Sequence, residues 1–239
     1  MVVAVVSAKG SPGVTSAALA LTAVADSGLL VELDPSGGSV ECWTGAVGEP
    51  GLIRVASGLR RSVDPEQLLG HAVEVPPGGW SVLAPTAGGL AESTISNLGA
   101  RLVSALAGWD RTVVVDAGRW SPSQATAERI RGCEAVAVVC APTVEGTEAA
   151  RWLVDPLEAV ATGPVVLLPV GDRPYGPEEV AAAVGVPVAG PLAWDPRGLR
   201  VLVSSGAGRG WARTALARSA RAALVALTGA DARSVVGRG

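Results

Sequence analysis

Short runs of aliphatic, mostly β-branched residues recur along the chain, and most of them are continuously apolar rather than alternating with polar residues. Strands of a parallel sheet that are covered by helices on both faces have this pattern. We therefore expect strands at Val2–Val6, Leu29–Leu33, Trp80–Leu83, Thr112–Val115, Ala135–Cys140, Val165–Val170 and Val186–Ala189.

The segments between these runs carry apolar residues at spacings of three and four, which is typical of helices with one buried face. The expected helices are Thr15–Ser27, Glu92–Gly108, Ser123–Arg131, Glu145–Ala161, Gly176–Val184, Arg197–Ser205 and Gly210–Leu227. This alternation predicts a doubly wound α/β fold with a mainly parallel sheet of about seven strands.

The pattern also predicts the domain organisation. No low-complexity linker divides the chain, so we expect one domain over residues 1–227 and a flexible tail over residues 228–239. The segment Pro35–Gly79 is the least regular, with short helices expected at Leu52–Gly58 and Pro65–Gly70. A connection of that length usually carries functional loops.

Composition narrows the class of protein. The 239 residues are 49% hydrophobic, and the net charge of −3 with a pI near 5.3 argues against a surface that binds nucleic acid throughout. Three cysteines show no metal-ligand spacing, and no apolar run is long enough to be a signal peptide or a membrane span. We expect a cytoplasmic protein.

Candidate chemistry begins in the loop after the first expected strand, which reads Ser7-Ala8-Lys9-Gly10-Ser11-Pro12-Gly13-Val14-Thr15-Ser16. A strand, a glycine-containing loop and a helix present backbone N–H groups and a helix N-terminus to an anion. Thr15 is placed to cap the helix or to bind Mg²⁺. The alternative is a plain Gly/Pro turn without a ligand.

The basic residues of this loop depart from an ordinary phosphate loop, which ends in Gly-Lys-Ser/Thr and uses that lysine to contact phosphate. Here Val14 stands in its place and cannot donate to phosphate. Lys9 lies at the front of the loop instead, and it is the only lysine among the 19 basic residues of the chain.

Two acidic residues follow expected strands: Asp34 after Leu29–Leu33, and Asp116 after Thr112–Val115. Ligands of open α/β sheets bind outside the carboxyl ends of the strands, and Mg²⁺ prefers a few carboxylates with water. Each aspartate alone is equally typical of a turn after a strand. Their order after a glycine loop favours a nucleotide site.

The loop resembles the deviant Walker A motif of the ParA/MinD family of partitioning and positioning P-loop ATPases, Lys-Gly-Gly-x-Gly-Lys-Thr/Ser. The resemblance implies that Lys9 is the signature lysine, which contacts the phosphates of a partner subunit. It assigns phosphate binding and the metal site by position. The phosphate-binding residues are Lys9, Gly10, Ser11, Gly13, Val14, Thr15 and Ser16, and the Mg²⁺ ligands are Thr15 and Asp116.

Later segments extend this resemblance over about residues 1–227. The run Glu32-Leu33-Asp34-Pro35 is similar to the family's switch I, which makes Asp34, with Lys9, a catalytic candidate. Asp116 matches the Walker B aspartate. Residues 50–52 and 82–86 are most similar to the CpaE/TadZ branch, which helps to place pili and secretion machinery.

The departures from the family's motif imply that ATP is hydrolysed slowly, if at all. Val14 removes the lysine that acts within its own subunit, Pro12 removes one backbone donor, and the Asn that often follows the sixth strand near adenine is missing after Pro169. Loss of a positioned charge commonly reduces phosphoryl transfer by ~10²–10³-fold. Efficient ATP hydrolysis is therefore not expected.

The resulting hypothesis is a degenerate, dimeric ParA/MinD-like protein that binds ATP and Mg²⁺ or has lost them, and that positions cellular machinery with protein partners. One alternative is a slow but genuine ATPase that acts with DNA or membrane; another is an interaction scaffold that needs no nucleotide. Basic residues of the last helix are the candidates for DNA or membrane contact at a membrane or cell pole, but a helix that closes the sheet is favoured. These residues are Arg209, Arg213, Arg218 and Arg221.

Overall fold

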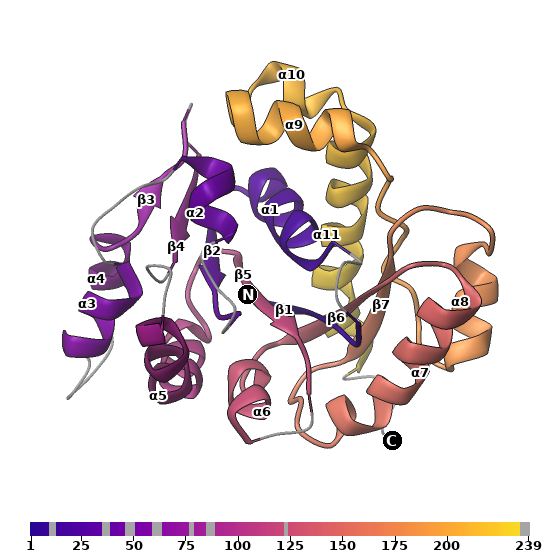
Figure 1. Ribbon diagram of the computed structural model, residues 1–239, viewed down its shortest axis with the longest axis horizontal. Helices are drawn as coiled ribbons and strands as arrows, with labels where there is room; N and C mark the ends of the chain where they lie inside the picture. The colour runs from indigo at the N-terminus through magenta and orange to yellow at the C-terminus, as the bar shows by residue number, and fades with distance from the viewer. Residues whose placement is uncertain are drawn as a thin grey trace.

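A seven-stranded sheet forms the centre of the molecule (Figure 1). The structure, a computed structural model, describes residues 1–9, 13–34, 39–45, 51–58, 64–76, 79–84, 89–121 and 124–234. The strand order is β3-β4-β2-β5-β1-β6-β7, and all pairs except β3–β4 are parallel. The strands are β1 (Val2–Ser7), β2 (Gly28–Glu32), β3 (Val73–Glu74), β4 (Trp80–Leu83), β5 (Val113–Arg119), β6 (Ala135–Cys140) and β7 (Val165–Pro169). The predicted doubly wound, mainly parallel fold is confirmed.

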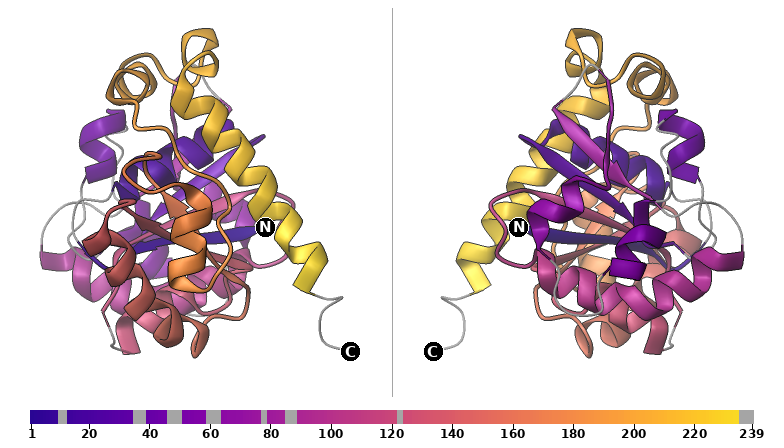
Figure 2. Two further views of the ribbon diagram at one scale, coloured as in Figure 1. Left: turned by 90° about the vertical axis from the view of Figure 1, so that its right-hand side faces the viewer. Right: turned by 90° about the vertical axis from the view of Figure 1, so that its left-hand side faces the viewer.

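Helices cover both faces of this sheet, as Figures 1 and 2 show. Helices α1, α9, α10 and α11 contribute residues to the buried cluster on one face. Helices α3 to α8 contribute residues to the cluster on the other face. The helices are α1 (Val14–Val24), α2 (Ser39–Thr44), α3 (Gly51–Gly58), α4 (Pro65–Leu69), α5 (Gly89–Leu106), α6 (Gln124–Ile130), α7 (Val144–Glu158), α8 (Pro177–Val184), α9 (Pro196–Ser205), α10 (Arg209–Ala212) and α11 (Ala215–Ser234).

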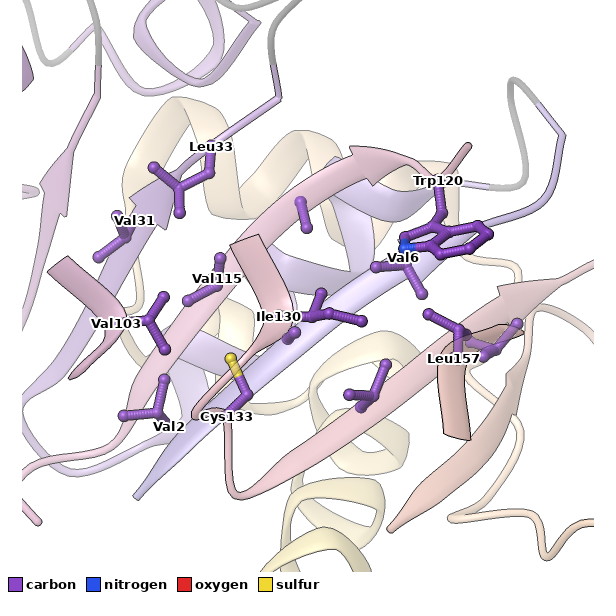
Figure 3. Close-up of a cluster of buried hydrophobic side chains, with 14 of the residues drawn as sticks. Val2, Val6, Val31, Leu33, Val103, Val115, Trp120, Ile130, Cys133 and Leu157 are labelled. Atoms are coloured by element: carbon purple, nitrogen blue, oxygen red, sulfur yellow. The ribbon is translucent and has the colours of Figure 1, made fainter. Parts of the chain in front are cut away.

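Alternation along each strand divides the core into these two clusters, because successive side chains point to opposite faces of a sheet. In β1, Val2 and Val6 join the cluster beneath α5 to α8, whereas Val3 and Val5 face α1 and α11. Figure 3 shows part of the first cluster, where Ile130 of α6 lies over the strands. Side chains on both faces of the sheet are therefore buried, which explains why the strands are continuously apolar.

One expected strand is wrong. Residues Val186–Ala189 make an isolated bridge between Val188 and Leu167, not a strand. Pro187 has no N–H to donate and can only accept, from Leu167 at 2.8 Å, so the ladder does not extend. The seventh strand is β3 instead, a two-residue antiparallel edge strand that is too short to leave a hydrophobic pattern.

The expected last helix, Gly210–Leu227, is also corrected. It is two helices, α10 and α11, and α11 continues to Ser234 beside the C-terminal end of the chain (Figure 2). Leu227 is 1% exposed, and the next two residues of α11, Thr228 and Gly229, are exposed although the helix continues. The tail expected from residue 228 therefore starts as helix. Among the described residues, no helix has the length and apolarity needed to cross a bilayer.

Candidate functional site

The N-terminus of α1 follows the carboxyl end of β1, which lies between β5 and β6 in the sheet. Gly13 is the residue that opens this helix, with φ of 94°, a backbone conformation that favours glycine. It provides no side-chain cap, and no acidic residue occurs in the first turn. Among the described residues, no side chain caps the first turn of α1, an arrangement that suits an external acceptor. The predicted ligands Gly10 and Ser11, and the departure at Pro12, lie outside the described residues.

Asp116 lies inside β5, not after it as expected, because β5 continues to Arg119. It is 0% exposed, and its Oδ1 accepts a hydrogen bond from the Gly118 N–H at 3.1 Å. Its buried Oδ2 has no hydrogen-bond partner in the described structure. Burial raises the pKa of Asp116 to about 6, with a further increase from the Asp34 charge; the Thr15 hydroxyl and the Gly118 N–H oppose this by hydrogen bonding. The structure therefore brings Thr15, Asp34 and Asp116 together.

Asp34 is held in place at the end of β2 by the backbone of β5. The preceding residue, Leu33, donates its N–H to Asp116 O at 2.8 Å. Gly118 packs directly against the Asp34 carboxylate: a Cβ at this position would overlap it, and the φ of 66° also favours glycine. Glycine at 118 is thus required for the position of Asp34.

Arg129 of α6 supports the same strand ends and was missed by sequence reasoning. It is 5% exposed, and its guanidinium donates to Ala117 O at 2.9 Å and to Leu33 O at 3.4 Å. Burial lowers its pKa, whereas the nearby Asp34 charge raises it. A buried cation therefore joins β2 to β5 beside Asp34. Only the fold could reveal it, because nothing in the sequence distinguishes this arginine from the others.

Asp34, Gly118 and the first turn of α1 line one cavity of about 700 Å³, and the buried Asp116 and Arg129 lie behind this lining. Its polar wall consists of Ser7, the first turn of α1, Asp34, Gly118 and Arg119. Most of the remaining lining is apolar, although Asp195 also belongs to it; we define the apolar wall as Trp43, Val170, Leu192, Trp194, Pro196 and Leu199. Four of the residues predicted to bind phosphate, Gly13, Val14, Thr15 and Ser16, contribute to the lining. The aromatic contribution was not anticipated, since the tryptophans were interpreted as packing residues.

Lys9 is placed elsewhere. It is exposed and lines a separate hollow of about 170 Å³ with Thr143, Glu145 and Gly146 at the start of α7. The Glu145 pKa is lowered mainly by hydrogen bonds from its own backbone and Thr143, with a smaller contribution from Lys9. The structure therefore does not bring Lys9 to the cavity with Thr15 and Asp34.

The cavity's positive charge comes from Arg119, which sequence reasoning also missed. Val14 lines the cavity but is only 8% exposed and belongs to the core cluster around α1. Among the described lining residues, Arg119 is the only basic one. It pairs in register with Ser7 of β1, so it lies beside the loop that precedes α1. The unexpected length of β5 is what brings it there.

The donor set fits a phosphate with Mg²⁺. Hydroxyl and carboxylate oxygens, here Thr15 and the unpartnered Oδ2 of Asp116, are the ligands that Mg²⁺ prefers. Uncapped N–H groups at the start of α1 and the Arg119 guanidinium suit phosphate oxygens. In chemical terms, the residues present fit a Mg²⁺-phosphate compound.

Comparison with known proteins agrees with the fold. No protein-family model matches the sequence, and no curated protein matches it. The solved structures include the septum site-determining protein MinD from Pyrococcus horikoshii in complex with Mg-ADP, with a TM-score of 0.75 and 14% identity over 99% of this chain and 97% of that one. A ParA family ATPase from Chlorobium tepidum has a TM-score of 0.73 and 15% identity over 96% of both chains. The protein therefore has the ParA/MinD-like fold of P-loop NTPases.

The same fold also carries a different activity. Cobyrinic acid a,c-diamide synthase from Mycobacterium smegmatis, solved with an ATP analogue and magnesium, has a TM-score of 0.66 and 17% identity over 98% of this chain and 96% of that one. At such identities the likeness concerns the fold alone, so the function must be argued from the site.

Proposed function

We propose that this protein binds a nucleoside triphosphate, ATP in the first instance, with Mg²⁺ in the cavity at the start of α1. One observation carries the proposal: the first turn of α1 lines the cavity without a side-chain cap, and its Thr15 hydroxyl lies against the buried Asp116 carboxylate, whose Oδ2 has no hydrogen-bond partner among the described residues. Burial of such a group is costly unless a cation or a donor compensates it. Mg²⁺ bound to phosphate would supply that compensation.

Each residue then has a defined task. The N–H groups of Gly13 to Ser16 would hold phosphate oxygens, and Thr15 with Asp116 would hold Mg²⁺, which neutralises charge on the phosphates. Asp34 is half-buried and lines the cavity, where its carboxylate would orient water against the terminal phosphate. Gly118 and Arg129 position Asp34 from behind.

Slow hydrolysis, or binding without turnover, follows from the distribution of positive charge. The place of the lysine in α1 is occupied by Val14, whose side chain is in the core. We propose that Arg119 supplies the phosphate-facing charge in its stead, from a strand rather than from the helix. A charge in a different position supports binding better than it supports a transition state, because catalysis requires charge aimed where it develops.

The family and role remain proposals as well. The shared fold supports membership of the ParA/MinD family and a dimeric role in spatial positioning, with the CpaE/TadZ branch a finer hypothesis. Lys9 is exposed and lies outside the 700 Å³ cavity of its own subunit, which fits a contact with phosphates bound to a partner subunit. Val144, 63% exposed at the start of α7, is available to protein partners. A peripheral location at a membrane or cell pole belongs to the same proposal.

Calorimetry with ATP and Mg²⁺ tests the binding. We expect binding that weakens about tenfold or more in Arg119→Ala, because a charge-assisted hydrogen bond to phosphate is lost. Val14→Lys should raise affinity or turnover by restoring the missing cation. Arg173→Ala, at an exposed arginine outside the cavity lining, is the control. Absence of heat with folded protein at millimolar ATP would exclude nucleotide binding and leave the scaffold.

Light scattering with and without ATP tests the proposed dimer. A nucleotide-gated dimer should form only with ATP and should weaken in Lys9→Ala. A dimer of equal strength in both states would instead support a scaffold that needs no nucleotide.

A further inference from the structure

The apolar wall of the cavity presents aromatic surface to solvent. Trp194 is 73% exposed and Trp43 is 38% exposed, although both line the cavity, whereas Trp211 of α10 is 2% exposed in the core. An exposed indole contributes little to the core, since most of its apolar surface stays in water. Trp194 is therefore available to a flat ligand.

Polar groups around Trp194 are already engaged within the chain. The Asp195 carboxylate accepts from the N–H groups of Gly198 at 2.8 Å, Ala215 at 3.1 Å and Leu216 at 3.3 Å. The Ala193 N–H donates to the Ser219 hydroxyl at 3.0 Å. These donors and acceptors are consumed in holding the wall together, so they do not discriminate between ligand edges.

The backbone of Leu192 is engaged in the same way. Its N–H donates to Pro169 O at 2.8 Å, and its carbonyl accepts from the Gly171 N–H at 2.7 Å. Both contacts tie the segment before Trp194 to the end of β7. The apolar wall is thus anchored to the sheet, and its exposed side chain is the aromatic face of Trp194.

The polar wall holds phosphate in the function proposed above, and the inference that follows rests on that function. The flat part of a nucleoside triphosphate is its base. Helix α2, which carries Trp43, contacts both α1 and α9 (Figure 1). Both walls thus belong to one continuous site.

We infer that Trp194, assisted by Trp43, is a stacking platform for the base, and that the site accepts purine bases without selecting between them. Stacking tolerates different bases because each has a π face, whereas selection requires hydrogen bonds to the base edge. Trp194 contacts the face of the base in place of hydrogen bonds to its edge. It is a specificity-determining residue whose effect is to broaden specificity.

Calorimetry in Mg²⁺ with ATP, GTP and inorganic tripolyphosphate tests this inference. We expect ATP and GTP affinities within about tenfold of each other, and Trp194→Ala to weaken both by about 5- to 100-fold. Tripolyphosphate has no base, so its affinity should not change in that variant. Trp194→Phe, which keeps an aromatic face, should retain most of the affinity.

The matched control is Trp152→Ala. Trp152 of α7 is 71% exposed, about as much as Trp194, but it does not line the cavity. Its substitution should leave all three affinities unchanged. Thermal unfolding of both variants checks that each is folded, as expected for residues on the surface.

Outcomes separate this inference from the proposed function. If the wild type binds neither ATP nor tripolyphosphate, the proposed function fails and the inference fails with it. If ATP and tripolyphosphate bind equally and Trp194→Ala changes neither, only the stacking platform is wrong. ATP binding more than 100-fold tighter than GTP would overturn the base tolerance and leave nucleotide binding intact.

Discussion

At the residue scale, Asp116 combines a stability penalty with the chemistry proposed for it. Its carboxylate is fully buried, and one oxygen has no partner in the described structure. Burial raises its pKa to about 6, so near neutral pH the folded protein without ligand holds a charge that it accommodates poorly. Mg²⁺ would relieve that penalty, which links metal binding to stability.

We therefore expect Asp116→Asn to stabilise the ligand-free protein at pH 7.5 by about 1–3 kcal/mol, because a neutral amide replaces a desolvated charge. The same substitution should weaken Mg²⁺-dependent ATP binding. Denaturant unfolding and calorimetry measure the two effects. Asp110→Asn, at an exposed aspartate, should change neither. A loss of stability in Asp116→Asn would contradict the interpretation.

The sequence predicted part of the site at this scale. Thr15, Asp34 and Asp116 were expected to converge, because carboxyl ends of parallel strands meet at one edge, and they do. Arg119 and Arg129 were not found, since their proximity depends on strand length and on the packing of α6. The separate position of Lys9 likewise depends on the start of α7, which is distant in sequence.

At the element scale, Asp195 joins two helices. It is the N-cap of α9, through Gly198, and it also accepts from the first N–H groups of α11. These backbone hydrogen bonds lower the pKa of its carboxyl, with a small contribution from the Arg218 charge. The carboxylate thereby fixes the start of the helix that packs along α1.

Asp195→Ala should lower the free energy of unfolding at pH 7 by about 1–2 kcal/mol, since N-terminal donors lose their acceptor. The pKa of this group is lower in the folded state, so its contribution is complete above the ordinary pKa of aspartate and is lost as the pH falls through the folded value. The difference between wild type and variant, measured by denaturation at pH 7 and at strongly acidic pH, should therefore shrink on acidification.

Asp172→Ala, at an exposed aspartate, provides the comparison for this pH dependence. A difference for Asp195→Ala that stays constant with pH would mean that the carboxylate charge is not what holds the two helices.

Helix boundaries were predictable only where residues in the sequence mark the end of the helix. The expected start of the helix after Asp195 differs from α9 by one residue, because an N-cap aspartate and Pro196 mark it in the sequence. The end of α11 was misjudged because the residues directly after Leu227 are exposed while the helix continues to Ser234. Helix α2 was missed, since six residues leave too little pattern to detect.

At the scale of the whole molecule, one sheet separates two cores. Trp120 belongs to the cluster beneath α5 to α8, and Trp211 to the cluster with α1 and α11. Both cores use alternate side chains of the same strands, so the loss of either core would expose one face of these shared strands. This arrangement favours the single domain that the sequence predicted, which remains a proposal.

Equilibrium unfolding should therefore be one cooperative transition, with far-UV circular dichroism and tryptophan fluorescence changing at the same denaturant concentration. Trp120→Phe and Trp211→Phe variants would report from each core separately. Midpoints that differ between probes would show that the two sides unfold independently and would contradict a single domain.

The isolation of Lys9 has a practical consequence. It is the only lysine of the chain, it is exposed, and it lies beside α7 rather than in the cavity. An amine-reactive reagent will thus modify a single side chain, and the yield of that modification, read by mass spectrometry, becomes a direct reporter of subunit contact at this position. This chemical handle coincides with the residue on which the proposed dimer depends.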